Sequence, residues 1–168
     1  ELGVRWARAM RPFIWESAAR DSFVEPVQAM RQRVTDNIPA ADVDRQIKLG
    51  PGGLRDVEFT VQLLQLVHGR TDESVRTQGT TDSIAALAKA SYIGRKDAHD
   101  FADNYATLRV MEHRIQLLYM RRTHLMPVKE NDRRSLARAM TSPLAPTQLT
   151  EPEMLKQWAG IKRAVKSL

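Results

Sequence analysis

The sequence contains no cysteine among its 168 residues. Disulfide frameworks and thiolate metal sites are therefore excluded, and the absence of cysteine suits a protein of the reducing cytosol. No apolar run approaches the ~20 residues that are needed to span a bilayer, and no signal-like segment leads the chain. Aromatic residues make up only 6% of the sequence. Together these deficits predict a cytoplasmic protein with no membrane partner.

The charge balance is basic, but the basic residues are not concentrated in one block. The 26 Lys and Arg residues are interleaved with 20 Asp and Glu residues, which leaves a formal net charge of +6. Nucleic-acid binders present a dense basic face or exposed aromatics along a basic groove, and the sequence shows neither pattern. We therefore expect no nucleic-acid partner. The net charge alone still allows one alternative hypothesis, a helical protein that binds nucleic acid.

The tightest basic run comprises Arg121 and Arg122, with His124 just beyond. It falls at the predicted end of a long helix, where cations oppose the negative end of the helix dipole. Helix-end electrostatics is the simpler interpretation of this run. The alternative is a contact surface for an acidic protein partner.

Apolar residues recur at helical spacing along the whole chain, and no alternating strand pattern competes with them. The longest periodic segment runs from about residue 95 to 122. The sequence therefore predicts an all-α protein, a helical bundle built around one long central helix, as a single domain over residues 1–168. A linker is expected at residues 143–146. Further helices are predicted over residues 2–15, 26–37, 54–68 and 81–90 (capped by Thr81 or Asp82), from a cap at Asn131, and after a T-x-x-E capping box at Thr150.

The most informative segment is a glycine-rich loop that opens directly into a helix. Residues 48–62 read Lys-Leu-Gly-Pro-Gly-Gly-Leu-Arg-Asp-Val-Glu-Phe-Thr-Val-Gln. Three glycines and a proline within residues 50–53 cannot form a helix interior. Beyond them the helical period begins, and polar residues recur beside an apolar face. This polar stripe consists of Arg55, Glu58, Gln62 and Gln65.

Free backbone amides at a helix N-terminus, with Lys48 and Arg55 nearby, favour a phosphate or a carboxylate. The loop matches neither G-x-G-x-x-G nor the P-loop, because Gly53 is followed by Leu54 and Arg55. The spacing therefore predicts an anion-facing helix start and not a nucleotide fold. A capped or solvated helix start is the alternative interpretation.

The run from Lys48 to Phe59, followed by Gln62, resembles a long family signature, K-x-G-x-G-G-[IL]-R-[DE]-[IV]-E-F-x-x-Q. The signature is that of the bifunctional glutamine synthetase adenylyltransferase/adenylyl-removing enzymes. Such enzymes have two similar halves, each a nucleotidyltransferase domain followed by a helical bundle related to that of the PII uridylyltransferases. The Leu54-Arg55-Asp56 sequence after the glycines resembles the deadenylylating half.

The resemblance implies a helical domain of an enzyme that transfers AMP from ATP to a tyrosine of glutamine synthetase and removes it by phosphorolysis, thereby regulating nitrogen assimilation. It implies three partners: glutamine synthetase, the PII signalling protein and an adjacent nucleotidyltransferase domain. ATP and Mg²⁺ would be bound mainly by that domain, with no cofactor expected in the fragment. No glycine here is followed by serine, and Asp42-Val43-Asp44 suits a turn better than a metal site. We therefore expect a piece of a longer enzyme that is inactive alone.

The resemblance places the candidate site at an interface with the neighbouring domain, and no catalytic residue or metal ligand is assigned within the fragment. Arg55 would neutralise phosphate or pair with an acid of the catalytic domain, and Glu58 would orient Arg55 across one helical turn. The alternative is a non-catalytic interaction module that docks glutamine synthetase or PII. The candidate residues are Lys48, Gly50, Gly52, Gly53, Arg55, Asp56, Glu58 and Gln62.

Two groups of ionisable residues on the long helix are not expected to hold a metal. The acids around His99 drift around the helix, which indicates a solvated first turn. Glu112 and His113 lack the H-E-x-x-H arrangement of a zinc site. Glu112 and His113 are therefore expected to be ordinary surface or rim residues.

Overall fold

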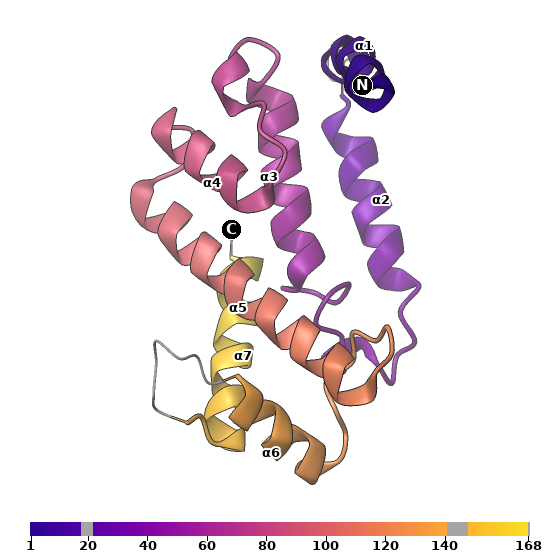
Figure 1. Cartoon of the computed structure of the whole chain (residues 1–168), viewed down its shortest axis with the longest axis vertical. Coiled ribbons are helices and arrows are strands. Elements are labelled where there is room, and N and C mark those ends of the chain that lie inside the picture. The colour runs from indigo at the N-terminus through magenta and orange to yellow at the C-terminus, as the bar shows by residue number, and fades with distance from the viewer. Residues whose placement is uncertain (18–21, 141–147, 168) are drawn as a thin grey trace. The chain divides into compact units, whose positions relative to one another are not determined.

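The computed structural model describes residues 1–17, 22–140 and 148–167. Within these ranges the chain forms seven α-helices, two short 3-10 helices and no strand, which confirms the all-α prediction (Figure 1). The linker expected at residues 143–146 lies outside the described residues. The helices are α1 (Leu2–Ser17), α2 (Val24–Asp36), η1 (Val43–Arg45), α3 (Leu54–His68), η2 (Glu73–Val75), α4 (Thr80–Lys89), α5 (Arg95–Tyr119), α6 (Glu130–Ala139) and α7 (Glu151–Lys166).

The chain divides into two compact units, and α3 and α5 each contribute residues to both. The prediction of a single domain stays a prediction. The glycine loop and the first turn of α3 belong to the second unit, whereas Gln62 belongs to the first. The first unit comprises Glu1–Arg33 and Phe59–Ala98, and the second comprises Val34–Glu58 and His99–Leu168.

The motif helix α3 begins and ends where the sequence predicts, and α5 supplies the predicted long helix. The last turn of α5 closes earlier than expected, at Tyr119. Met120 adopts a left-handed φ of 47°, and the amide of Arg121 donates back to the Gln116 carbonyl at 3.2 Å. A left-handed residue directly after a helix commonly terminates it in this way.

The predicted side-chain caps of the helix starts have mixed outcomes. The capping box of α7 is confirmed, because Thr150 and Glu153 each accept a hydrogen bond from the other's backbone amide. The predicted side-chain caps of α4 and α6 are wrong. Helix α4 starts at Thr80, after Gly79, and α6 starts at Glu130, after Lys129. Both preceding residues are extended, and neither helix start has a side-chain cap. Each helix thus starts before the residue that was expected to cap it.

The first unit contains a turn segment after α3 that is tied down by a buried amide side chain. Gln65 donates from Nε2 to the carbonyls of Val75 at 2.7 Å and Thr77 at 3.0 Å. Val75 itself is fully buried. The segment is therefore held against α3 by hydrogen bonds and by burial of an apolar side chain.

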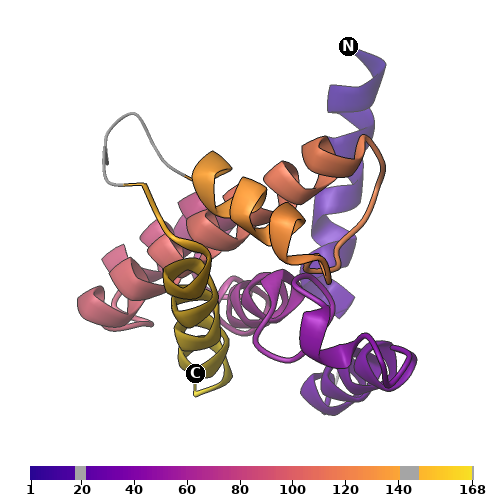
Figure 2. The same cartoon turned by 90° about the horizontal axis from the view of Figure 1, so that it is seen from below.

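The second unit has the larger apolar core. Helices α6 and α7 lie side by side in it, as both cartoon views show (Figure 2). Removing each large apolar side chain of this core from water is worth roughly 1.5–3 kcal/mol. The buried apolar residues are Ile38, Ile47, Leu54, Val57, Phe101, Leu108, Met111, Ile115, Met126, Leu136, Ala137, Met154, Trp158, Ile161 and Val165.

The glycine loop packs directly against the backbone of α7. Gly52 has a φ of +75°, and a Cβ at this position would overlap the carbonyl of Lys162. At Gly53 a Cβ would lie 2.6 Å from the carbonyl oxygen of Ile47. Packing within the second unit is therefore sufficient to require glycine at both positions.

None of the helices in the described part of the chain combines the length and the apolar character needed to cross a membrane.

We predict that Gly52→Ala lowers the free energy of unfolding. The left-handed backbone alone costs about 1–3 kcal/mol for a residue with a side chain, and α7 must also move away from the new methyl group. Gly160→Ala is the matched control, because a Cβ there meets nothing within 4 Å. Since Gly160 lies inside α7, its replacement should leave stability unchanged or raise it by up to about 1 kcal/mol. Urea denaturation of both variants gives the comparison, and equal stability of the two would contradict the packing argument.

Candidate functional site

The amides at the start of α3 are paired within the chain. Those of Leu54 and Arg55 donate to the carbonyls of Ile47 and Lys48 at 3.1 and 2.9 Å. The amide of Gly53 donates to the Gly50 carbonyl at 2.9 Å. The expectation that free amides at this helix start bind an anion is therefore wrong, because the preceding loop folds back and supplies their acceptors.

Asp56 completes the same loop from inside. It is buried, and its Oδ2 accepts a hydrogen bond of 2.7 Å from the amide of Gly52. A carboxylate that accepts from a backbone amide near a helix N-terminus stabilises the turn. Asp56 and the three glycines thus have evident structural roles, and nothing in the geometry adds a ligand-binding role for them.

Arg55 and Glu58 lie on the outer side of this helix turn. Nη1 of Arg55 is 3.2 Å from Oε2 of Glu58, as predicted for residues three apart on a helix. The Arg55 side chain is 42% exposed, against 15% for Glu58. The hydroxyl of Tyr105, on α5, donates to the other oxygen of Glu58 at 3.4 Å. Glu58 is therefore held from two sides, and it helps to fix a guanidinium that solvent can still reach.

Lys48 pairs with a buried carboxylate on α5. Its Nζ lies 3.0 Å from Oε1 of Glu112, whose side chain is only 2% exposed. Nη1 of Arg109 lies 2.6 Å from the other oxygen, Oε2. The prediction that Glu112 is a surface or rim residue is wrong, whereas its neighbour His113 is exposed as expected. A buried carboxylate needs such paired cations, because removing the charge from water is costly.

A signal for this buried position was present in the sequence. Glu112 lies four residues after Leu108 and three before Ile115, and both of these residues are fully buried. Helical spacing therefore places Glu112 within the apolar stripe of α5. An acid inside an apolar stripe indicates a paired buried charge, and this pattern could have singled it out.

His124 completes the cluster around Glu112. Its Nδ1 lies 3.0 Å from Oε1 of Glu112. The two atoms are not oriented for a hydrogen bond, so that Nδ1 has no hydrogen-bond partner among the described residues. Burial lowers the pKa of His124, and the positive charge of Lys48 lowers it further, against the opposing effect of Glu112. At neutral pH the imidazole is therefore uncharged, so that Lys48 and Arg109 supply the charges that balance Glu112.

Backbone pairing brings the loop and the segment after α5 together. An isolated antiparallel bridge joins Gln46 to Leu125. The amide of Ile47 donates to the His124 carbonyl at 2.9 Å, and the amide of Met126 donates to the Arg45 carbonyl at 2.8 Å. This bridge sets the separation of Lys48 and His124.

A basic concavity of about 820 Å³ surrounds the Glu112 cluster on the second unit. Apolar side chains also line it: Leu117 is 58% exposed and Met120 is 84% exposed. The run that was predicted to be helix-end cations thus contributes to a surface that is both basic and apolar. Its basic lining residues are Lys48, Arg109, His113, Arg121, Arg122 and His124.

The described residues do not fit a magnesium site. They contain no group of three His, Asp or Glu side chains that could hold a metal ion. The buried carboxylates Asp56 and Glu112 are already engaged by an amide and by cations. Asp42 pairs with Arg45 at 3.2 Å next to η1, in the turn that the sequence predicts. No chemical step is therefore assigned to a metal within this chain.

The sequence model of the GlnD PII-uridylyltransferase family matches residues 25–168. The chain belongs to this family. Its similarity to the bifunctional glutamine synthetase adenylyltransferase/adenylyl-removing enzymes, expected from the glycine motif, is confirmed by three relatives of that name. The identity is 56% over 168 residues for the relative from Leifsonia xyli subsp. xyli, which covers 100% of this chain and 16% of the relative.

Two further relatives carry the same name and match most of this chain. The enzyme of that name from Corynebacterium glutamicum is 45% identical over 170 residues, which covers 99% of this chain and 16% of the relative. The one from Mycobacterium tuberculosis is 52% identical over 141 residues, which covers 83% of this chain and 14% of the relative. The chain thus spans about one sixth of the length of the curated relatives that it matches.

We predict that Glu112→Gln destabilises the chain by about 3 kcal/mol, because breaking a buried ion pair leaves its partners without their counter-charge. The neutral amide keeps the shape of the side chain, so that the loss reports on charge. Glu130→Gln is the matched control, since Glu130 and its partner Arg134 are both 58% exposed. The control should change stability by less than about 0.5 kcal/mol. Equal midpoints for the two variants in urea would show that the cluster contributes no net stabilisation.

The lowered pKa of His124 predicts a specific pH dependence of stability. Because the folded chain resists protonation of this imidazole, the unfolded chain binds more protons below about pH 6.5. Stability should therefore fall as the pH is lowered from the unfolded pKa towards the folded one. His124→Gln should reduce the difference in unfolding free energy between pH 7.5 and pH 5. His99→Gln, at a side chain that is 76% exposed, is the control, and an undiminished difference in His124→Gln would assign the effect to other groups.

Proposed function

We propose that this chain is the helical domain of an enzyme that adenylylates and deadenylylates glutamine synthetase, and so regulates nitrogen assimilation. The observation that supports this proposal is the 56% identity, over all 168 residues, to the relative from Leifsonia xyli subsp. xyli, whose name gives both activities. The family match over residues 25–168 supports a helical domain as the shared unit. The activity belongs to the full-length enzyme, and the isolated chain is expected to be inactive.

The first turn of α3 would border the active site of an adjacent nucleotidyltransferase domain. Arg55 supports this proposal because Glu58 holds its guanidinium while 42% of the side chain stays exposed. A fixed, accessible guanidinium is suited to bind a phosphate or a carboxylate in a bidentate manner. The chemistry in this proposal comes from side chains, since the loop amides are already paired. Lys48 would add positive potential from the neighbouring loop.

The sequence after the glycines favours the deadenylylating half of the enzyme. Leu54, Arg55 and Asp56 follow the paired glycines, and this order resembles that half more than the adenylylating half. In the proposed reaction, an oxygen of inorganic phosphate attacks the phosphorus of the AMP group and the bond to the tyrosine oxygen breaks, so that ADP and the unmodified tyrosine are released. A positive side chain beside that site would balance charge that develops on the phosphoryl oxygens.

The remaining expectations follow from the same assignment. Glutamine synthetase would be the protein substrate, PII the signalling partner, and the cytoplasm the location. ATP and Mg²⁺ would be bound mainly by the nucleotidyltransferase domain. Neither a nucleic acid nor a membrane is part of the proposal.

The second candidate function is a non-catalytic interaction module that docks glutamine synthetase or PII. The basic concavity around Glu112 favours this candidate, because Leu117 and Met120 stand exposed beside Arg121 and Arg122. Apolar anchors among cations suit an acidic protein surface.

We predict that Arg55→Ala in the full-length enzyme lowers the rate of phosphorolysis of adenylylated glutamine synthetase. A loss of roughly 10²-fold is typical when one group that stabilises transition-state charge is removed. Adenylylation by the other half should be unaffected. Arg163→Ala, at an exposed position of α7, is the matched control and should retain full activity.

Unchanged phosphorolysis in Arg55→Ala would count against a role of this residue at the active site. The interaction-module candidate makes a different prediction. In that case Arg121→Ala and Arg122→Ala would weaken binding of glutamine synthetase or PII, while the turnover at saturating substrate would stay the same.

A further inference from the structure

Helix α1 has an apolar face that the described chain leaves uncovered. Four large apolar residues recur at i, i+4, i+8 and i+11, which places them on one side of a helix with 100° per residue. Their exposed fractions are high for side chains of this kind. They are Leu2 at 80%, Trp6 at 65%, Met10 at 38% and Phe13 at 59%. We call these four residues the outer face of α1.

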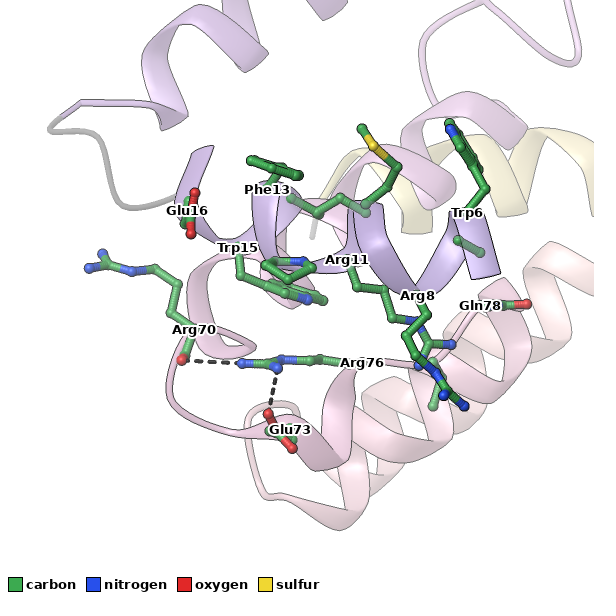
Figure 3. Close-up of a pocket in the computed structure, with 15 residues that line it drawn as sticks. Trp6, Arg8, Arg11, Phe13, Trp15, Glu16, Arg70, Glu73, Arg76 and Gln78 are labelled. Atoms are coloured by element: carbon green, nitrogen blue, oxygen red, sulfur yellow. Dashed lines mark hydrogen bonds and ion pairs between the residues drawn. The ribbon is translucent and has the colours of Figure 1, made fainter. Parts of the chain in front are cut away.

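On the opposite side of α1, Trp15 contacts the rest of the first unit. The guanidinium of Arg76 lies over the Trp15 ring, 4.7 Å from its centroid. Figure 3 shows Trp15, Arg8 and Arg11 on the side of α1 nearest to Arg76, while Trp6 and Phe13 point the other way. A Cβ on Gly69 would come within 2.6 Å of the Trp15 ring, so this packing is close.

This orientation is the reverse of an ordinary surface helix. Such a helix turns its apolar stripe towards its own core and its charges towards water. Here two exposed arginines, Arg8 and Arg11, flank Trp15 on the side nearest to Arg76, and the apolar side faces the other way. Pro12 lies inside α1 and weakens its intrinsic helicity. A contiguous exposed apolar face on such a helix is typical of a surface that another protein part covers.

We infer that the outer face of α1 is a docking surface for an apolar patch on a further domain of the same polypeptide. The family match begins at residue 25, after α1. The relative from Leifsonia xyli nevertheless matches all 168 residues, and this chain spans 16% of its length. Helix α1 is therefore shared by an enzyme in which most of the polypeptide lies outside this chain and is available to cover it.

The size of the outer face favours a tethered partner over a second copy. A large side chain has on the order of 150–250 Å² of surface to bury. Weighted by the exposed fractions given above, the four side chains of the outer face together offer on the order of 500 Å². Separate proteins that associate stably bury about 800 Å² each. A covalently attached domain needs less contact area, because its association is intramolecular. The inference rests on the proposed function in one respect, because it takes this chain as one domain of a longer enzyme, but it involves neither the motif loop nor Arg55.

Hydroxyl-radical footprinting tests this inference without measuring activity. The full-length enzyme and the 168-residue chain are oxidised at equal concentration, and the rates at Trp6, Met10 and Phe13 are compared. We expect rates roughly fivefold lower in the full-length enzyme, as for side chains that enter an interface core. Equal rates in the two proteins would overturn the inference.

A double variant, Trp6→Gln with Phe13→Gln, separates docking from folding. In the 168-residue chain it should leave the melting temperature unchanged, because both side chains are exposed there. In the full-length enzyme it should lower the melting temperature by several degrees. Val128→Gln, at an apolar position that is 65% exposed outside both surfaces, is the control for the loss of one large apolar side chain from the surface. A loss of stability in the 168-residue chain equal to that in the full-length enzyme would overturn the inference.

Two further measurements address other occupants of the outer face. Sedimentation of the 168-residue chain between 5 and 200 μM is expected to show a monomer. A dimer that the double variant dissociates would assign the face to self-association instead. Likewise, binding of the full-length enzyme to phosphatidylglycerol vesicles, abolished by the double variant, would assign it to a membrane surface. Either result would overturn the inference.

Discussion

The buried charge of Glu112 is the interaction on which the geometry of the motif loop depends. A carboxylate withdrawn from water requires counter-charges, and Lys48 and Arg109 supply them at 3.0 and 2.6 Å. Lys48 lies two residues before Gly50, whereas Glu112 lies in the apolar stripe of α5. The ion pair therefore fixes the loop to this helix, and the bridge between Gln46 and Leu125 secures the same loop from its other side.

The glycine signature turns out to be chiefly a packing device. Gly52 permits the backbone to touch α7, and Asp56 accepts the amide that Gly52 presents. The loop carbonyls meanwhile occupy the first amides of α3, which leaves the helix start without an anion cradle. What this construction exposes is the side chain of Arg55, braced by Glu58. In our proposal the signature therefore serves function indirectly, by holding one guanidinium in a fixed position at the surface.

Two surfaces of the chain find an explanation in a longer polypeptide. The first turn of α3 carries a guanidinium that is 42% exposed beside its partner Glu58, and the outer face of α1 carries apolar area that the described residues leave exposed. Both are intelligible if the remaining five sixths of a relative's length supply the complementary surfaces. The two proposals are physically independent, because one rests on ion pairing and the other on the burial of apolar side chains.

The sequence by itself determined the helical class, the bounds of α3 and the capping box at Thr150. These depend on residues close together in the chain, so that spacing and local hydrogen bonding are sufficient. It also located Arg55 and Glu58 one turn apart. Tertiary structure alone decided that the loop amides are satisfied by Ile47 and Lys48. It also decided that the partner of the Glu112 carboxylate is Lys48, 64 residues away. Contacts between distant segments depend on how whole elements pack, and no local pattern encodes their partners.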